Sequence, residues 1–227
     1  MKFEKLACLG LVMDGNRRWA RERALPVYEG HAEGYKKLRE VLGWARKAGV
    51  PHVVAYAFST ENWNRAEEEV GYLLDLFRSV LKNETQKLSE EDVRIRFVGD
   101  TSRFPEDLRT LIQEVEAATR DHAGLTLHLL VSYGGREEIV AAANRLLAEG
   151  VSFVTKDTFA AHLWSHPMLD PDLIIRTGGE KRLSNFLPWQ STYSELFFLD
   201  TLWPDFSEEE FNTVLAEFAA RERRHGK

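Results

Sequence analysis

The chain has 227 residues, of which 44% are hydrophobic and 29% charged, with a formal net charge of −6 at pH 7. This length and composition are typical of one large globular domain, which we expect to span residues 1–227. The negative charge argues against a nucleic-acid partner, and the single cysteine, Cys8, excludes an internal disulfide framework and a cysteine-rich zinc site.

Short apolar runs predict strands, and apolar residues at helical spacing predict helices between them. The predicted strands are Leu6–Met13, His52–Phe58, Val93–Val98, Leu125–Val131, Leu173–Ile175 and Leu196–Leu199. The predicted helices cover Arg17–Arg23, His31–Ala48, Glu67–Leu88, Pro105–His122, Glu137–Leu147 and Ser207–Arg223. This alternation predicts an α/β fold with a mostly parallel central sheet of about six strands, covered by helices on both faces.

We expect a cytoplasmic location. The residues Met1–Lys5 lead directly into the first predicted strand, without the pattern of a signal peptide. The longest apolar run near the start is far shorter than the roughly 20 residues that span a bilayer. Any membrane contact would then be peripheral, at the inner face.

Unusual polar segments follow five of the predicted strands, and ligands of parallel sheets bind beyond the carboxyl ends of the strands. We therefore expect these segments to form one shared site. They are Asp14–Arg18, Ser59–Arg65, Gly99–Asp100, Tyr133–Arg136 and Arg176–Glu180.

The first segment, from Asp14 to Arg18, joins a strand to a helix. Free backbone N–H groups at a helix start and two forked guanidiniums suit a phosphate. The Asp14 carboxylate would repel that phosphate unless a cation lay between them, and Mg²⁺ resolves the conflict. Ordinary turn chemistry also accounts for Asp-Gly-Asn, because Gly15 and Asn16 tolerate positive φ.

The second segment, Ser59–Arg65, offers Arg65 for phosphate, Trp63 as an apolar wall and Asn62 to position a reacting group. A helix cap at Asn62 or Asn64 is the alternative interpretation. A second anion-binding set is Arg176, Arg182 and Ser184, beside a glycine-rich turn that could equally carry solvated charges. The dinucleotide and Walker-type glycine motifs are absent, which argues against NAD and ATP.

Together these segments resemble the cis-prenyltransferase family, and specifically its bacterial undecaprenyl diphosphate synthases. The matching motifs occur in family order over nearly the whole chain. They are MDGNRRWA (13–20), GH (30–31), YAFSTENWNR (56–65), VGD (98–100), YGGR (133–136), DLIIRTGGEKRLSNFLPWQSTYSEL (172–196) and WPDF (203–206).

The resemblance implies a homodimer with an apolar tunnel for the growing prenyl chain. It also implies Mg²⁺-dependent condensation of isopentenyl diphosphate onto an allylic diphosphate, usually farnesyl diphosphate. The product would be a polyprenyl diphosphate such as undecaprenyl diphosphate, the lipid-carrier precursor for cell-wall synthesis.

The resemblance also implies residue roles. Asp14 and Asn62 would be catalytic, and Asp14 and Glu195 would hold the metal. Allylic diphosphate binding would involve Gly15, Asn16, Arg17, Arg18, Trp19 and His31. The reacting pair would be organised by Ser59, Thr60, Glu61, Trp63 and Arg65. Isopentenyl diphosphate would be bound by Arg176, Arg182, Leu183 and Ser184.

The homodimer expectation draws on the apolar stripe of Glu67–Leu88 and on Arg224–Gly226, which resembles the family's partner-reaching RxG. The chain departs from the family at Val27, where many bacterial members carry a diphosphate-binding arginine, and at Arg17, where glycine is frequent. We expect Arg17 to compensate for Val27.

Two other functions were weighed. A dehalogenase-like phosphohydrolase needs a second acid two residues from the first, as in DxDG, and here Val12 occupies that position. A non-catalytic subunit of a prenyltransferase complex would be expected to lose residues such as Asp14 and Arg65, which are present.

Overall fold

The computed structural model describes residues 6–221, and between residues 84 and 90 it describes the backbone alone. The strands are β1 (Cys8–Val12), β2 (His52–Ser59), β3 (Val93–Val98), β4 (Leu125–Tyr133), β5 (Leu173–Arg176) and β6 (Glu195–Phe198). They form one sheet in the order β3-β4-β2-β1-β5-β6, and every pairing is parallel. The predicted fold class is confirmed.

Helices follow most strands, as parallel crossovers require. They are α1 (Asn16–Glu22), α2 (Val27–Ala48), α3 (Glu67–Glu90), α4 (Glu106–Ala118), α5 (Gly135–Ala148), α6 (Lys156–Ala161) and α7 (Glu208–Ala220). Short 3₁₀ turns are η1 (Thr60–Asn64), η2 (Thr101–Arg103) and η3 (Trp203–Asp205). The sequence reasoning missed α6, which is too short to show an apolar stripe and begins at a capping box of Thr155 and Thr158.

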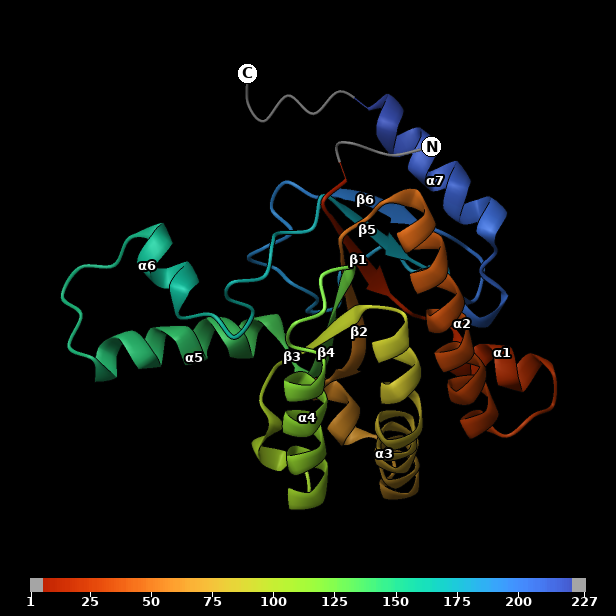
Figure 1. The fold of residues 1–227 in the computed structure, drawn as a ribbon, viewed down its shortest axis with the longest axis horizontal. Helices are drawn as coiled ribbons and strands as arrows, with labels where there is room; N and C mark the ends of the chain where they lie inside the picture. Colours follow the sequence, from red (N-terminus) through yellow and green to blue (C-terminus); the bar gives the residue numbers. More distant parts are fainter. Residues whose placement is uncertain (1–5, 222–227) are drawn as a thin grey trace.

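The sheet has two buried faces, and alternate residues of each strand supply them. Leu9 and Leu11 of β1 belong to the larger core, which includes buried residues of α2, α4 and α7. Cys8 and Val12 belong to the smaller core, which contains Phe186 and other residues outside regular elements. Helices therefore dominate one face, and irregular segments contribute much of the cover of the other. Figure 1 shows α3 and α4 side by side, with α5 and α6 extending away from them.

The apolar stripe of α3 faces the interior of this chain. Val70, Leu73, Leu74 and Phe77 pack against the larger core, and Leu81 is part of it. The stripe is therefore not a free surface for a partner, and the dimer argument based on it is wrong. The second basis of that argument, Arg224–Gly226, lies outside the described residues.

The order of the strands places β1 between β2 and β5. The chain leaves β1 toward β2 on one side and later returns to β5 on the other, so a crevice opens beyond the carboxyl end of β1. Asp14 lies at this point of the sheet, two residues after the end of β1.

Candidate active site

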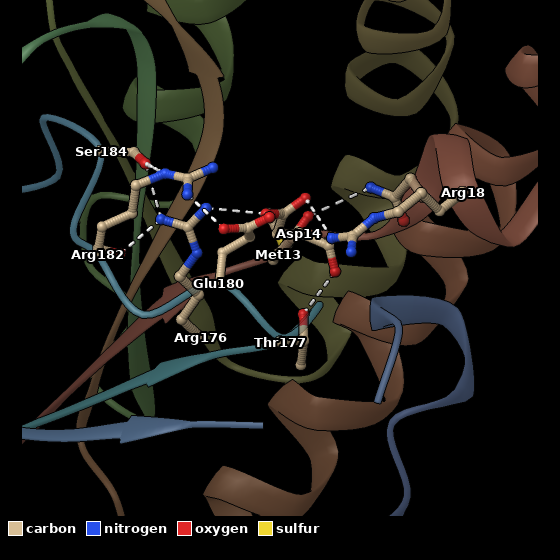
Figure 2. A network of polar contacts seen from close by, with 9 residues as sticks. Met13, Asp14, Arg18, Arg176, Thr177, Glu180, Arg182 and Ser184 are labelled. Atoms are coloured by element: carbon tan, nitrogen blue, oxygen red, sulfur yellow. Dashed lines mark hydrogen bonds and ion pairs between the residues drawn. The ribbon is translucent and has the colours of Figure 1, made fainter. Parts of the chain in front are cut away.

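Asp14 lies between two arginines that come from different elements (Figure 2). Its Oδ2 accepts a hydrogen bond of 2.8 Å from Nη2 of Arg176, and its Oδ1 lies 3.5 Å from Nη2 of Arg18. The backbone is fixed as well, because the Asp14 carbonyl accepts hydrogen bonds from Thr177 Oγ1 at 2.8 Å and from the Trp203 amide at 3.0 Å. The carboxylate is therefore held in place while its side chain stays 33% exposed.

The turn after Asp14 depends on Gly15. Its φ of 117° lies in the left-handed region, and an added Cβ would lie 2.9 Å from Cα of Leu202. A side chain at this position would therefore strain the start of α1 and displace the segment beside it. Gly15 shapes the site through its backbone.

Arg176 is the most buried cation of the site, with 5% of its side chain exposed. Its Nη1 donates to Ser184 Oγ at 2.7 Å and to the Arg182 carbonyl. Arg182 Nε donates to the same Ser184 hydroxyl at 3.2 Å, and Arg182 also pairs with Glu180. Figure 2 shows this chain of contacts running from Arg182 to Asp14. The structure thus brings together the second predicted anion-binding set and the Asp14 turn.

A polar cleft of about 540 Å³ collects half of the predicted site residues. These are Asp14, Asn16, His31, Ser59, Glu61, Asn62, Arg65, Arg176 and Ser184. Sequence reasoning did not assign Tyr56 and Asn185, which also line the cleft. Tyr56 lies in β2, on the same face of the strand as His52 and Val54. Burial raises the pKa of its hydroxyl above the usual value, so the hydroxyl stays protonated.

An apolar cavity of about 150 Å³ adjoins the cleft and shares with it Met13, Asn16, His31, Ala57 and Leu73. Its further lining comes from α2, from α3 and from strands of the sheet. Those residues include Leu38, Leu42, Leu74, Phe77, Ile95, Leu127 and Leu129. The polar cleft, which contains the charged side chains, is thus continuous with an apolar cavity.

Arg17, His31 and Arg65 meet at the carboxylate of Glu69, a residue of α3 that sequence reasoning missed. The contacts are 2.9 Å from Arg65, 3.4 Å from His31 and 3.6 Å from Arg17. Burial and then the charge of Arg65 lower the pKa of His31 below its usual value, although Glu69 acts in the opposite direction. The imidazole is therefore neutral near pH 7.

The η1 turn positions Asn62 and Trp63 differently. Asn62 Oδ1 accepts a hydrogen bond of 3.1 Å from the Ser59 amide, so the amide side chain fastens the turn and also faces the cleft. Trp63 packs against Phe58 and Phe104, and its Nε1 donates to Ser132 Oγ at 3.0 Å. The expected apolar wall of the site is thus not formed by Trp63, which does not line the cleft.

Other predicted substrate contacts also lie outside the cleft lining. Trp19 Nε1 donates to Asp205 at 2.7 Å, Leu183 packs against the smaller core, and Thr60 lines a separate pocket of about 360 Å³. The preference of an indole N–H for a carboxylate partner explains the direction of Trp19. These placements do not support direct substrate contact in the present conformation.

The prediction that Glu195 shares a metal with Asp14 is wrong within one chain. Glu195 begins β6 and pairs with Leu173, which in turn pairs with Leu9. Asp14 follows the other end of β1, so at about 3.3 Å per residue the two lie at least ~10 Å apart along the strands. Glu195 instead accepts a hydrogen bond of 2.6 Å from Arg221.

The Asp14 carboxylate is the candidate protein ligand for Mg²⁺. Among the side chains that the structure describes, no group of three or more His, Cys, Asp or Glu could hold a metal ion. Mg²⁺ commonly takes only one or two carboxylates and completes its shell with water and substrate phosphates. One partly exposed carboxylate in an arginine-lined cleft fits that mode.

Known proteins resemble the chain over nearly its full length. The family described as "Putative undecaprenyl diphosphate synthase" matches residues 12–226. Isoprenyl transferases of Neisseria gonorrhoeae and Aquifex aeolicus are 46% and 40% identical to it; each match covers 96% of this chain, and 88% and 95% of the respective relatives.

Two solved structures share the fold. Lavandulyl diphosphate synthase from Lavandula x intermedia, in complex with dimethylallyl diphosphate, superposes with a TM-score of 0.93 at 34% identity, covering 98% of both chains. A probable undecaprenyl diphosphate synthase from Campylobacter jejuni gives 0.84 at 34% identity, covering 98% of this chain and 99% of that one. Both the sequence and the fold therefore lead to the same enzymes, and the chain belongs to the undecaprenyl diphosphate synthase family of isoprenyl transferases.

Proposed function

We propose that this prenyltransferase catalyses Mg²⁺-dependent cis-prenyl elongation, condensing isopentenyl diphosphate onto an allylic diphosphate, with farnesyl diphosphate as the starter. One observation carries the proposal: the arginine-lined polar cleft and the apolar cavity share five lining residues. A prenyl diphosphate has the same two parts, an anionic head and an apolar tail. We propose undecaprenyl diphosphate or a polyprenyl diphosphate like it as the product.

The two diphosphates would occupy different sides of Asp14. His31 lines both the cleft and the apolar cavity, Arg65 lines the cleft, and Arg18 contacts Asp14 from α1. These three suit the allylic substrate, whose tail needs that cavity. Arg176, Arg182 and Ser184 form the other side and suit isopentenyl diphosphate, whose hydrocarbon part is small.

The reaction breaks the allylic C–O bond and forms a C–C bond to isopentenyl diphosphate, which then loses a proton. Charge develops on the leaving diphosphate, and fixed guanidiniums stabilise it because they need no reorganisation. Asp14 would hold Mg²⁺, whose charge neutralises diphosphate oxygens. The apolar cavity keeps water from the allylic cation-like centre.

Two relationships support the substrate class. The lavender enzyme binds dimethylallyl diphosphate, an allylic diphosphate shorter than farnesyl diphosphate. The clustering of Asp14, Arg65 and Arg176 around one cleft favours a catalyst over a non-catalytic subunit.

We also propose a homodimer. Val140 and Leu147 of α5 and the nearby Phe153 are 59%, 74% and 78% exposed, a degree of apolar exposure that a partner subunit would cover. Light scattering should then give twice the 26.1 kDa chain mass. A monomer at assay concentration would contradict the dimer.

Among residues 6–221, no helix is both long and apolar enough to cross a membrane. We propose peripheral membrane contact at the stage of product release, because the product tail is lipid-like. Flotation with phospholipid vesicles, with and without product, would test this.

The test of the function is product analysis. The protein is incubated with Mg²⁺, radiolabelled isopentenyl diphosphate and either dimethylallyl, geranyl or farnesyl diphosphate, and the dephosphorylated products are separated by chain length. Repeated addition to farnesyl diphosphate supports the proposal. Absence of transfer with every starter would overturn it, and one addition alone would refute chain elongation.

A further inference from the structure

Glu69 is the meeting point of three elements, and its partner His31 lines both the polar cleft and the apolar cavity. Glu69 lies in the first turn of α3, whereas its partners Arg17, His31 and Arg65 come from α1, from α2 and from the segment after η1. Its side chain is 15% exposed, so water screens these contacts only partly. One carboxylate thus gathers two side chains that line the polar cleft, His31 and Arg65, together with Arg17 of α1.

The cluster of Arg17, His31, Arg65 and Glu69 carries a net positive charge. Burial lowers the pKa of Arg65 and the Arg17 charge lowers it further, whereas Glu69 raises it. The two guanidiniums therefore repel each other, and Glu69 is the carboxylate that both contact. With His31 neutral, two cations and one anion leave the group with a net charge of about +1.

A diphosphate and the Glu69 carboxylate can accept hydrogen bonds from the same side chains, because both present oxygen acceptors to these donors. Glu69 keeps the donors gathered when no substrate is bound, so little ordering remains when the anion enters. The negative charge of Glu69 also reduces the attraction of the group for that anion. Glu69 therefore fixes the orientation of the three donors and lowers their affinity for a diphosphate.

We propose, resting on the allylic-diphosphate assignment above, that Glu69 is a positioning residue that preorganises Arg17, His31 and Arg65 for transition-state charge. It acts through these three side chains and takes no part in bond making. Its role separates turnover from binding: the carboxylate raises kcat and does not strengthen diphosphate affinity.

The chain supplies a matched control. Glu67, Glu68 and Glu69 are consecutive in the first turn of α3, and only Glu69 among them is not exposed. Glu69→Gln and Glu68→Gln change the net charge equally and are nearly isosteric with the wild-type side chain. Any difference between them comes from the contacts of Glu69 rather than from charge or the helix dipole.

Two quantities are measured on the full chain: the Kd of inorganic pyrophosphate by calorimetry, and kcat with farnesyl and isopentenyl diphosphates at saturation. For Glu69→Gln we expect kcat to fall about tenfold or more, the effect of one charged hydrogen bond lost at the transition state. We expect the pyrophosphate Kd to stay equal or to decrease. Glu68→Gln should match the wild type in both.

Weaker pyrophosphate binding in Glu69→Gln, with or without a change in kcat, would overturn the proposal, since that result indicates a merely structural role. An unchanged kcat would also overturn it. If Glu69→Gln does not fold, Glu69→Asp, which keeps the charge but shortens the reach, should lower kcat and leave Kd unchanged; any other result contradicts the proposal. A wild type without prenyl transfer would refute the proposed function instead, while pyrophosphate binding would still test the charge argument.

Discussion

Asp14 and Arg176 are 162 positions apart in sequence, and a 2.8 Å hydrogen bond joins the Asp14 carboxylate to the Arg176 guanidinium. The pair bridges β1 and β5 at the crevice where the strand order reverses. Arg176 is nearly buried, so its charge has few other partners than Asp14, Ser184 and the Arg182 carbonyl. The acid at the proposed metal position therefore also orients the arginine that we propose binds isopentenyl diphosphate.

Asp14→Asn should reduce kcat by about 10²-fold or more while the protein stays folded. The amide oxygen can still accept a hydrogen bond from Arg176, but the charge that attracts Mg²⁺ is lost. Steady-state kinetics and a thermal melt check the prediction. Near-normal turnover would show that the Asp14 carboxylate has no catalytic role.

Chelation by EDTA should abolish turnover and leave the melting temperature nearly unchanged. The described side chains contain no metal cage that could stabilise the fold, so the metal is expected to enter with substrate. Adding excess Mg²⁺ should restore activity. Full activity in EDTA, or unfolding on chelation, would contradict this.

Arg182→Ala and Arg18→Ala should each raise the KM for a different one of the two substrates. Arg182 contacts Ser184, whereas Arg18 contacts Asp14 from α1. Loss of Arg182 should raise the KM for isopentenyl diphosphate about tenfold, and loss of Arg18 should raise that for the allylic substrate by a similar factor. Separate titrations of the two substrates check this. Equal effects on both substrates would argue against two distinct anion pockets.

Stability should depend on pH through His128, which lies in β4 with its Nε2 3.5 Å from Nδ1 of His52. Burial, and then the charges of His52 and the nearby arginines, lower the pKa of His128 to about 3. The unfolded chain takes up this proton near its usual pKa of about 6.5. As the pH is lowered from that value toward 3, the free energy of unfolding therefore decreases by about 1.4 kcal/mol per pH unit.

His128→Gln removes this titration. Urea unfolding at pH 7 and pH 4.5 should show a smaller loss of stability in the variant than in the wild type. Identical losses would indicate that His128 is protonated in the folded state as readily as in the unfolded state.

Much of the site was predictable because polar residues directly follow apolar strands, and parallel strands bring their ends to one edge. This rule identifies Asp14, Ser59–Arg65 and Arg176 from the sequence alone. It also bears on Glu195, which begins a strand and so belongs to the opposite edge. Its metal role came from family resemblance, and the register of β5 and β6 contradicts it within one chain.

Side-chain direction was less accessible to sequence reasoning. Nothing in the run Glu67–Glu69 marks the third acid as the one that is not exposed, since that depends on how α3 lies against α1 and α2. Trp63 follows the turn of η1 toward Ser132 rather than the cleft, and its direction depends on Phe58 and Phe104. Tertiary packing decides both.

The contacts of the Asp14 carbonyl also bear on how the enzyme is made. The Asp14 carbonyl accepts hydrogen bonds from Thr177 Oγ1 and from the Trp203 amide, so its final geometry requires residues that are synthesised well after Asp14 itself. A nascent or truncated chain that ends before Trp203 would lack the hydrogen bond from the Trp203 amide and all of α7. The Asp14 turn of a nascent chain therefore reaches its final geometry only after Trp203 has been synthesised.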